Sequence, residues 1–186
     1  MTTYIALLRG INVGGKNIIK MANLKRMFEE MGLSEVQTYI QSGNVLFKSN
    51  EKEEILRKHI EYKIGKTFGF SVAVVLRTAE ELKRIICNCP FSDEEISEAE
   101  SSSEGERLYV ALLLNSPSQE NVESLNSYRS KSDDFWIRGR EVYLLFSKSI
   151  RNSKLANNLQ KLDVPMTIRN WKSINKLAEL AKSMEC

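Results

Sequence analysis

The sequence contains few of the residues and segments on which several common protein classes depend. Its longest apolar stretches, residues 72–76 and 110–114, are far shorter than the ~20 residues that cross a bilayer. The first residues, Met1-Thr-Thr-Tyr4, carry no basic leader and run directly into a strand-like segment, so we expect no cleaved secretory signal. The sequence therefore predicts a cytoplasmic protein that does not interact with membranes.

Metal-binding residues are equally scarce. The three cysteines are Cys87, Cys89 and Cys186, and His59 is the only histidine. This set is too small for a disulfide framework and lacks the four ligands of a structural zinc site. We expect reduced thiols, no metal and no cofactor.

The sequence shows no group of residues typical of acid–base or nucleophilic catalysis. We expect His59 to pack on the apolar side of a helix, because it lies between Ile55 and Ile60 and no Ser or Cys nucleophile is spaced beside it. Cys87 and Cys89 lie at a helix end and are interpreted as half-buried thiols. Most glutamates lie on predicted helix faces, and no pair of carboxylates is placed for acid–base work. An enzyme is the least favoured class.

Charge is unevenly distributed, although the net charge is only +3. Residues 1–28 contain five basic residues and no acid, residues 92–106 are acidic, and residues 138–182 are again basic. Blocks of this kind are typical of solvated surfaces and, less often, of anion-binding sites.

The acidic segment 92–106 also divides the chain. It is rich in Ser and Glu and has little apolar surface to bury, which is typical of a linker with a helical turn at its start. We therefore predict a first subdomain at 1–91, a linker at 92–106, and a second subdomain with a C-terminal helix at 107–186.

Both sides of this linker show the same order of predicted elements. The first half has strands at 4–9, 36–40, 45–48 and 72–76, and helices marked by apolar stripes around Leu24–Met31 and Ile55–Phe68, before a closing helix opened by the capping box Thr78/Glu81. The second half has strands at 108–114, 135–137, 142–146 and 166–168, with helices around Val122–Tyr128, Leu155–Leu162 and Ile174–Ala181. The repeated pattern predicts an α+β protein made of two tandem ferredoxin-like (βαββαβ) subdomains that arose by internal duplication.

This topology brings two loops of the first half together. Strand one of a split βαβ unit lies between strands three and four, so its end is next to the start of strand three. The loop at 10–17 should therefore meet the hairpin at 41–44. We take the polar residues and glycines of this edge as a candidate site for a phosphate or carboxylate: Arg9, Gly10, Asn12, Gly14, Gly15, Lys16, Asn17, Gln41, Ser42, Gly43 and Asn44. The alternative is a long turn whose side chains cap its own backbone.

The segment Gly10-Ile-Asn-Val-Gly-Gly-Lys-Asn17 is one residue away from the phosphate-binding pattern GxxxxGK[ST]. Three features exclude a P-loop NTPase. Asn17 replaces the magnesium-binding Ser or Thr, the apolar helical stripe starts only near Leu24, and no apolar strand ends in Asp.

Three basic residues outside this edge are secondary candidates. Arg77 and Arg169 occupy matched positions at the ends of the last strands, where a salt bridge between domains or at a helix end is favoured over ligand binding; Lys154 is the third. Aromatic residues such as Tyr4, Phe47 and Tyr143 could stack RNA bases only if they lay on an open sheet face, and no RGFGF-like run supports that function.

Several motifs together resemble one family. They are Leu8-Arg-Gly-Ile-Asn-Val-Gly-Gly-Lys16, Tyr39-Ile-Gln-Ser-Gly-Asn-Val45, Leu76-Arg77, Cys89-Pro-Phe91, Ser153-Lys-Leu155 and Thr167-Ile-Arg-Asn-Trp171. The chain is similar over nearly its whole length to the bacterial family catalogued as domain of unknown function number 1697. Cys89 stands where the family often has Asn. The resemblance implies two ferredoxin-like subdomains, but no activity, cofactor or catalytic residue.

The sequence thus favours a protein that binds an anionic ligand, such as a nucleotide, a phosphorylated metabolite or a nucleic-acid backbone. A non-catalytic interaction or scaffold protein is the alternative, followed by a metal-independent enzyme.

Overall fold

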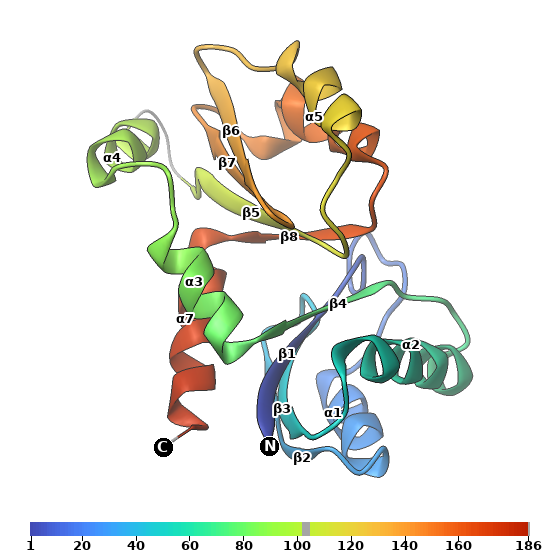
Figure 1. Cartoon of the computed structure of the whole chain (residues 1–186). Helices are drawn as coiled ribbons and strands as arrows, with labels where there is room; N and C mark the ends of the chain where they lie inside the picture. Colours follow the sequence, from blue (N-terminus) through green and yellow to red (C-terminus); the bar gives the residue numbers. More distant parts are fainter. Residues whose placement is uncertain (102–104, 186) are drawn as a thin grey trace. The chain divides into compact units, whose positions relative to one another are not determined.

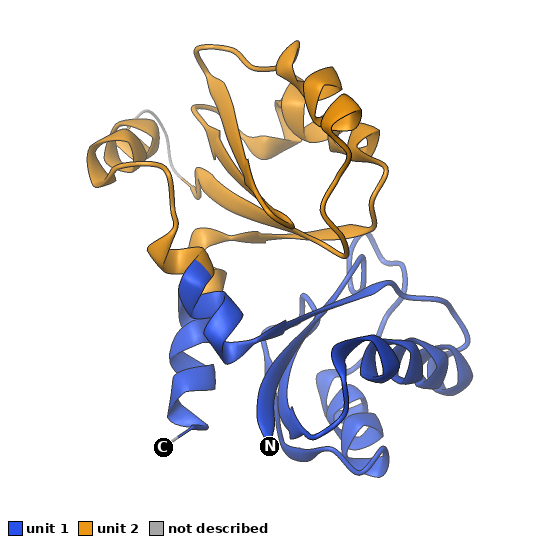
Figure 2. Ribbon diagram, in the orientation of Figure 1, with its two compact units in different colours: residues 1–84, 175–186 blue, residues 85–174 orange. Residues whose placement is uncertain are grey.

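The protein is described by a computed structural model that covers residues 1–101 and 105–185. Residues 102–104 of the predicted linker, and Cys186, lie outside the described residues. The chain forms two compact units, residues 1–84 with 175–186, and residues 85–174 (Figure 2). The C-terminal residues therefore group with the first unit, whereas the boundary at the acidic segment stays a prediction.

The first unit contains a four-stranded antiparallel sheet with two helices between its strands (Figure 1). Its elements are β1 (Thr2–Leu8), α1 (Met21–Glu30), β2 (Ser34–Tyr39), β3 (Asn44–Ser49), α2 (Glu53–Phe68), β4 (Val74–Thr78) and α3 (Ala79–Cys87), the last of which continues into the second unit.

The order of strands in this sheet is β2-β3-β1-β4, and β1 runs antiparallel to both of its neighbours. The register pairs Leu7 with Asn44 on one side and Leu8 with Val74 on the other. The end of β1 therefore lies beside the start of β3, as the predicted topology requires.

The core of this unit lies between the sheet and helices α1 and α2. Alternate strand residues such as Ala6, Leu8 and Leu76 pack with Phe28 of α1 and Ile60 of α2. Side chains on successive strand residues point to opposite faces. The residues that point away from the helices are buried as well, including Ile5, Leu7 and Arg77.

The second unit contains a second antiparallel sheet of four strands, in the order β6-β7-β5-β8. Its elements are α4 (Asp93–Ser101), β5 (Leu108–Leu113), α5 (Gln119–Asn126), β6 (Asp133–Arg138), β7 (Glu141–Phe146), the 3-10 turn η1 (Ile150–Asn152), α6 (Lys154–Asn157), the 3-10 turn η2 (Leu159–Leu162), β8 (Met166–Asn170) and α7 (Trp171–Ser183), which passes into the first unit at Asn175. Ala111, Leu144 and Phe146 form its core with Leu125 and Leu159.

The predicted helix around Leu155–Leu162 is wrong as a single element. The segment consists of a four-residue helix between two 3-10 turns. The side-chain amide of Asn158 donates to the carbonyl of Lys154 (2.7 Å), and Asp163 ends the segment in the left-handed region. Asn and Asp make local bonds of this kind in place of a regular helix.

The predicted apolar stripe of α2 needs a correction at two positions. Its buried residues are Leu56, Ile60 and Ile64, four residues apart. His59 and Ile55 precede two of them by one residue, which turns each about 100° away from the core. Ile55 is therefore 51% exposed, and the side chain of His59 is 61% exposed instead of packed.

The aromatic residues that the sequence offered for stacking, Tyr4, Phe47 and Tyr143, are buried. Tyr4 and Phe47 stack on each other within the helix-side core of the first unit, with ring centroids 5.9 Å apart. Tyr143 is buried on the opposite face of the second sheet, where its hydroxyl donates to the carbonyl of Ile85 (2.7 Å). Burial raises the pKa of Tyr143 above its ordinary value, which keeps this hydroxyl protonated.

The helix caps follow the sequence closely. The backbone amide of Thr78 donates to the carboxylate of Glu81, and the amide of Glu81 donates to the hydroxyl of Thr78. Asn170 accepts from the amide of Ser173 at the start of α7. Within the described residues, none of the helices is both long and apolar enough to cross a bilayer.

The capping box gives a direct test of how α3 is held. Thr78→Ala removes the hydroxyl that accepts from the amide of Glu81 (3.2 Å) and should destabilise the protein by about 1 kcal/mol. The midpoint of urea unfolding, followed by circular dichroism, measures this change. Thr67→Ala, at an exposed position near the end of α2, is the matched control and should alter the free energy of unfolding by less than about 0.5 kcal/mol. Equal effects of the two substitutions would contradict a role for the cap.

Candidate functional site

The structure brings the two predicted loops together at the end of β1. The amide of Leu8 donates to the carbonyl of Gly43 (2.8 Å), and the side-chain amide of Asn12 donates to the carbonyl of Gln41 (2.9 Å). The loop after β1 and the turn before β3 are thus joined by both backbone and side-chain hydrogen bonds.

Residues 12–17 form a very short hairpin, which we call the finger. The amide of Lys16 donates to the carbonyl of Val13 (3.1 Å), and the amide of Asn12 donates to the carbonyl of Asn17 (3.1 Å). Gly14 and Gly15, between the paired residues, both have positive φ values of 59° and 72°. Positive φ at both central residues defines a type I′ turn, whose twist matches that of a hairpin.

The geometry of this loop differs from that of a P-loop in two respects. A P-loop wraps its amides around phosphate and continues into a helix at the lysine. Here the amide of Lys16 is used inside the finger, and α1 begins only at Met21. A Cβ atom added at Gly14 or Gly15 would meet nothing within 4 Å, so these glycines supply backbone conformation and not space for a ligand.

Three asparagines of the candidate site hold the loops in place. Asn12 donates to the carbonyls of Ile19 (3.0 Å) and Gln41 and accepts from the amide of Ile19 (2.8 Å). Asn17 donates to the carbonyl of Gly10 (3.2 Å). Asn44 donates to the carbonyl of Tyr39 and to the hydroxyl of Ser42. These side chains build the site's framework, as in the alternative of a self-capping turn.

Gly43 is required for the close approach of the two loops. It is buried with φ of 86°, and an added Cβ would lie 2.8 Å from both Leu8 Cβ and Ile11 Cδ1. Contacts below 3.0 Å with Cβ of a central strand force the backbone to move, so this position excludes every other residue without rearrangement.

The residues left for a partner are the exposed ones. Arg9, Lys16, Gln41 and Lys20 are exposed, while Ser42 is half-buried and Gly10 lies open to solvent. Arg9, Lys16 and Lys20 form no ion pair with any residue in the described parts of the chain. The site therefore presents positive charge that the protein does not neutralise.

Apolar side chains accompany this charge. Val13 is 66% exposed, Ile18 is 61% exposed, and Ile40, in the neighbouring turn, is 49% exposed. Ile40 also has φ of 47°, which is costly for a β-branched residue. Sequence reasoning missed these residues; the available signal was the presence of β-branched residues on both sides of the glycines.

The secondary candidates Arg77 and Arg169 are buried. The guanidinium of Arg77 donates to the carbonyl of Leu76 (2.8 Å), and that of Arg169 donates to the Thr167 hydroxyl and the Ile168 carbonyl. Burial lowers the pKa of Arg169 to about 10. Neither side chain is presented to a ligand at the surface, and their hydrogen bonds to strand backbone are structural.

Lys154 is exposed at the edge of a hollow in the second unit. The hollow has a volume of about 330 Å³ and is lined mainly by serines and by Lys148, Lys154, Arg129 and Asp133. Ser153 spans it by donating to Asp133 (2.6 Å) and accepting from the amide of Ala156. The hydroxyl of Ser130 accepts from the amides of Ser132 and Asp133 at the same hollow.

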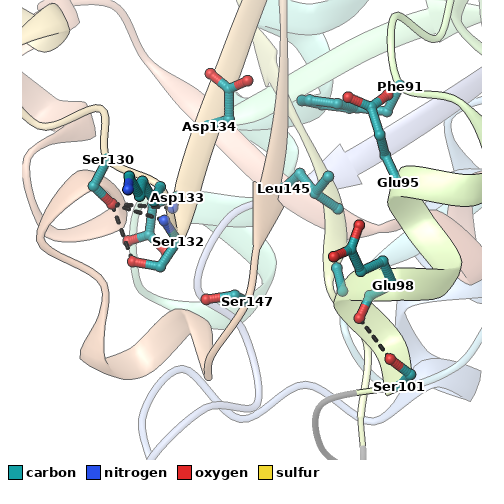
Figure 3. Close-up of a pocket in the computed structure, with 12 residues that line it drawn as sticks. Phe91, Glu95, Glu98, Ser101, Ser130, Ser132, Asp133, Asp134, Leu145 and Ser147 are labelled. Atoms are coloured by element: carbon teal, nitrogen blue, oxygen red, sulfur yellow. Dashed lines mark hydrogen bonds between the residues drawn. The ribbon is translucent and has the colours of Figure 1, made fainter.

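A larger hollow of about 550 Å³ lies between α4 and the β6–β7 hairpin (Figure 3). Glu95 and Glu98 of α4 line one side, and Asp133 and Asp134 of β6 line the other. Asp134 is paired with Arg129 (2.9 Å), and Glu95 accepts from the amide of Ser92. No group of three or more metal-ligating side chains occurs in the part of the chain that the structure describes.

The cysteines and the histidine that the structure describes differ in exposure and in their neighbours. Burial raises the pKa of the Cys89 thiol, which makes it a poorer nucleophile at neutral pH, and Cys87 is exposed. His59 Nδ1 lies 3.4 Å from the carboxylate of Glu51 on an open helix surface.

The rigidity of the site can be tested at two of its glycines. Gly43→Ala combines a left-handed φ with contacts of 2.8 Å, so it should lower the free energy of unfolding by roughly 2–4 kcal/mol. Gly14→Asn is the control, because Asn tolerates the positive φ of a type I′ turn and the site is open; it should change stability by less than about 1 kcal/mol. Thermal and urea unfolding measure both. A Gly43→Ala protein as stable as the control would show that the two loops are not held tightly.

Comparison with known proteins places the chain in a family. A model of a family described as a protein of unknown function (DUF1697) matches residues 1–143. No match is found among curated proteins. Among solved structures, the conserved bacterial protein SP0830 from Streptococcus pneumoniae is similar, with a TM-score of 0.73 and 27% sequence identity over 97% of this chain and 98% of that one. The finger, the β3 turn and the whole first sheet lie inside the matched region, and the chain belongs to the DUF1697 family.

Proposed function

We propose that this protein binds an anionic partner at the finger and the adjacent turn. The observation that carries the proposal is a pair of exposed cations beside a turn fixed by hydrogen bonds. Arg9 lies just before the finger, and Lys16 lies within it. Because the backbone that carries these cations is already fixed, binding costs the rotamer freedom of the two side chains but not the ordering of a loop.

The chemistry of these side chains suits phosphate. The guanidinium of Arg9 can donate two parallel hydrogen bonds to an oxyanion, while the ammonium of Lys16 acts as a point charge. The side chain of Gln41 can add neutral hydrogen bonds from the neighbouring turn. These residues are the ligand-binding part of the predicted site, and the asparagines and Gly43 are its support.

The open position of the finger favours an extended anion, such as a nucleic-acid backbone, over an enclosed nucleotide or metabolite. Gly14, Gly15 and Lys16 are all exposed. Small-molecule sites usually enclose most of the ligand's surface, which an exposed finger does not do.

We also infer that the two units are tandem ferredoxin-like subdomains produced by duplication. Both have the same order of strands in their sheets, and each keeps its main helices on one face. We also propose that the protein is cytoplasmic and that it acts by binding, without catalysis.

A protein-interaction surface is the second possible function, and the exposed Val13, Ile18 and Ile40 support it. Exposed apolar side chains next to charge are typical of surfaces that another macromolecule covers.

The anion-binding proposal predicts a loss of salt-sensitive binding when the two cations are removed. Arg9→Ala/Lys16→Ala should weaken binding to a fluorescent 20-base-pair DNA at least tenfold at low salt. It should also reduce the slope of log K against log[salt] by about 2, because each phosphate contact contributes about 0.9. Fluorescence anisotropy over a salt series measures both quantities.

Arg26→Ala/Lys66→Ala removes the same charge from exposed positions on α1 and α2 and serves as the control. Its slope and affinity should stay close to those of the wild type. Parallel titrations with ATP test the enclosed-nucleotide alternative. Unchanged DNA binding in the Arg9/Lys16 variant, or equal losses in both variants, would refute the proposal.

A further inference from the structure

The finger carries a feature that anion binding alone does not explain. Val13 lies in the finger and Ile18 follows directly after it, and each has about two thirds of its surface exposed. Phosphate contacts would use the cations Arg9, Lys16 and Lys20 and polar groups of the neighbouring turn, and would leave this apolar pair uncovered. An apolar pair kept in solvent beside unpaired cations indicates a partner with both a charged backbone and an apolar interior.

The shape of the finger restricts that partner further. Residues 12–17 form a single tight turn, in which one backbone bridge joins Val13 to Lys16 and Gly14 and Gly15 close it. The major groove of a duplex, about 12 Å wide, admits even a two-stranded β-ribbon, so a single turn of this kind fits into it. The phosphates on either side of the groove then lie where cations next to the turn can reach them.

The charge of the surrounding sequence agrees with this shape. Residues 1–28 contain five basic residues and no acid. Any approach of the finger to a polyanion is therefore free of repulsion from residues next to it in the chain.

We propose that the finger enters a groove of double-stranded nucleic acid, with Arg9, Lys16 and Lys20 on backbone phosphates and Val13 and Ile18 against base edges or base steps. This inference rests on the proposed anion-binding function and names its ligand. Apolar side chains contact thymine methyl groups in the major groove and wedge between base steps in the minor groove.

The alternatives fit less well. Single strands are usually bound by stacking on aromatic rings, whereas the exposed apolar residues here, Val13 and Ile18, are aliphatic. Peripheral membrane binding relies mainly on Trp, Phe and Leu on a broad amphipathic surface, which two β-branched residues do not provide. An acidic protein surface lacks a regular groove of the width that admits the finger.

The test removes the apolar pair without changing charge. Val13→Thr/Ile18→Thr keeps β-branched residues suited to a hairpin while replacing apolar groups by hydroxyls. We expect its affinity for the 20-base-pair duplex to fall by roughly tenfold, with an unchanged salt slope. Ile55→Thr, at an exposed isoleucine on α2, is the control and should bind as the wild type does.

The probes are the duplex, one of its separated strands, a heparin fragment and vesicles of phosphatidylcholine with phosphatidylserine. The inference predicts tightest binding to the duplex. Equal binding to the single strand or heparin, tighter binding to vesicles, or an unaffected Val13/Ile18 variant would overturn it. If Arg9→Ala/Lys16→Ala still weakens duplex binding in the last case, the anion-binding function stands and only the groove contact fails. If the wild type binds none of the polyanions, both fail.

Discussion

The pairing of β1 with β3 is the constraint on which the rest of the first unit depends. It sets the register that aligns Leu7 with Asn44, and the amide of Leu8 then reaches the carbonyl of Gly43. A shift of one residue would turn every side chain of β1 to the other face and would also separate the finger from the turn that supports it. Core packing and the geometry of the exposed surface are therefore consequences of the same hydrogen-bond ladder.

The supporting residues show how a loop can be made rigid with little hydrophobic core. Asn12 and Asn17 both have positive φ, and their side chains bond to backbone groups of Ile19 and Gly10. Asn accepts this conformation more readily than other non-glycine residues, because its short amide can bond locally. The polar side chains of Asn12 and Asn17 thus stabilise the conformation of the loop. The exposed side chains that take no part in these hydrogen bonds remain for a partner.

Much of the fold could be predicted from local patterns. Apolar runs and turn residues located the strands, the Thr78/Glu81 and Asn170 caps marked the starts of two helices, and the strand connections implied that two distant loops would meet. The sequence could not predict which residues of the site support the loops and which stay exposed to a partner. Whether an asparagine faces a ligand or a carbonyl depends on its φ, which no sequence pattern specified. The burial of Arg77 depends on its pairing with Ile5, which turns it away from the helices.

The two sheets share an order of strands, yet the connections after their first strands differ. Residues 9–20 separate β1 from α1, whereas residues 114–118 are enough to join β5 to α5. Among the described residues, the hairpin extension thus belongs to one half of the chain only. A monomer would then engage a long polymer at a single point, without avidity. The time that the protein stays bound to the polymer would be set by the dissociation rate of this single contact. Self-association of the chain would lengthen that time, because two fingers could then bind the polymer at once.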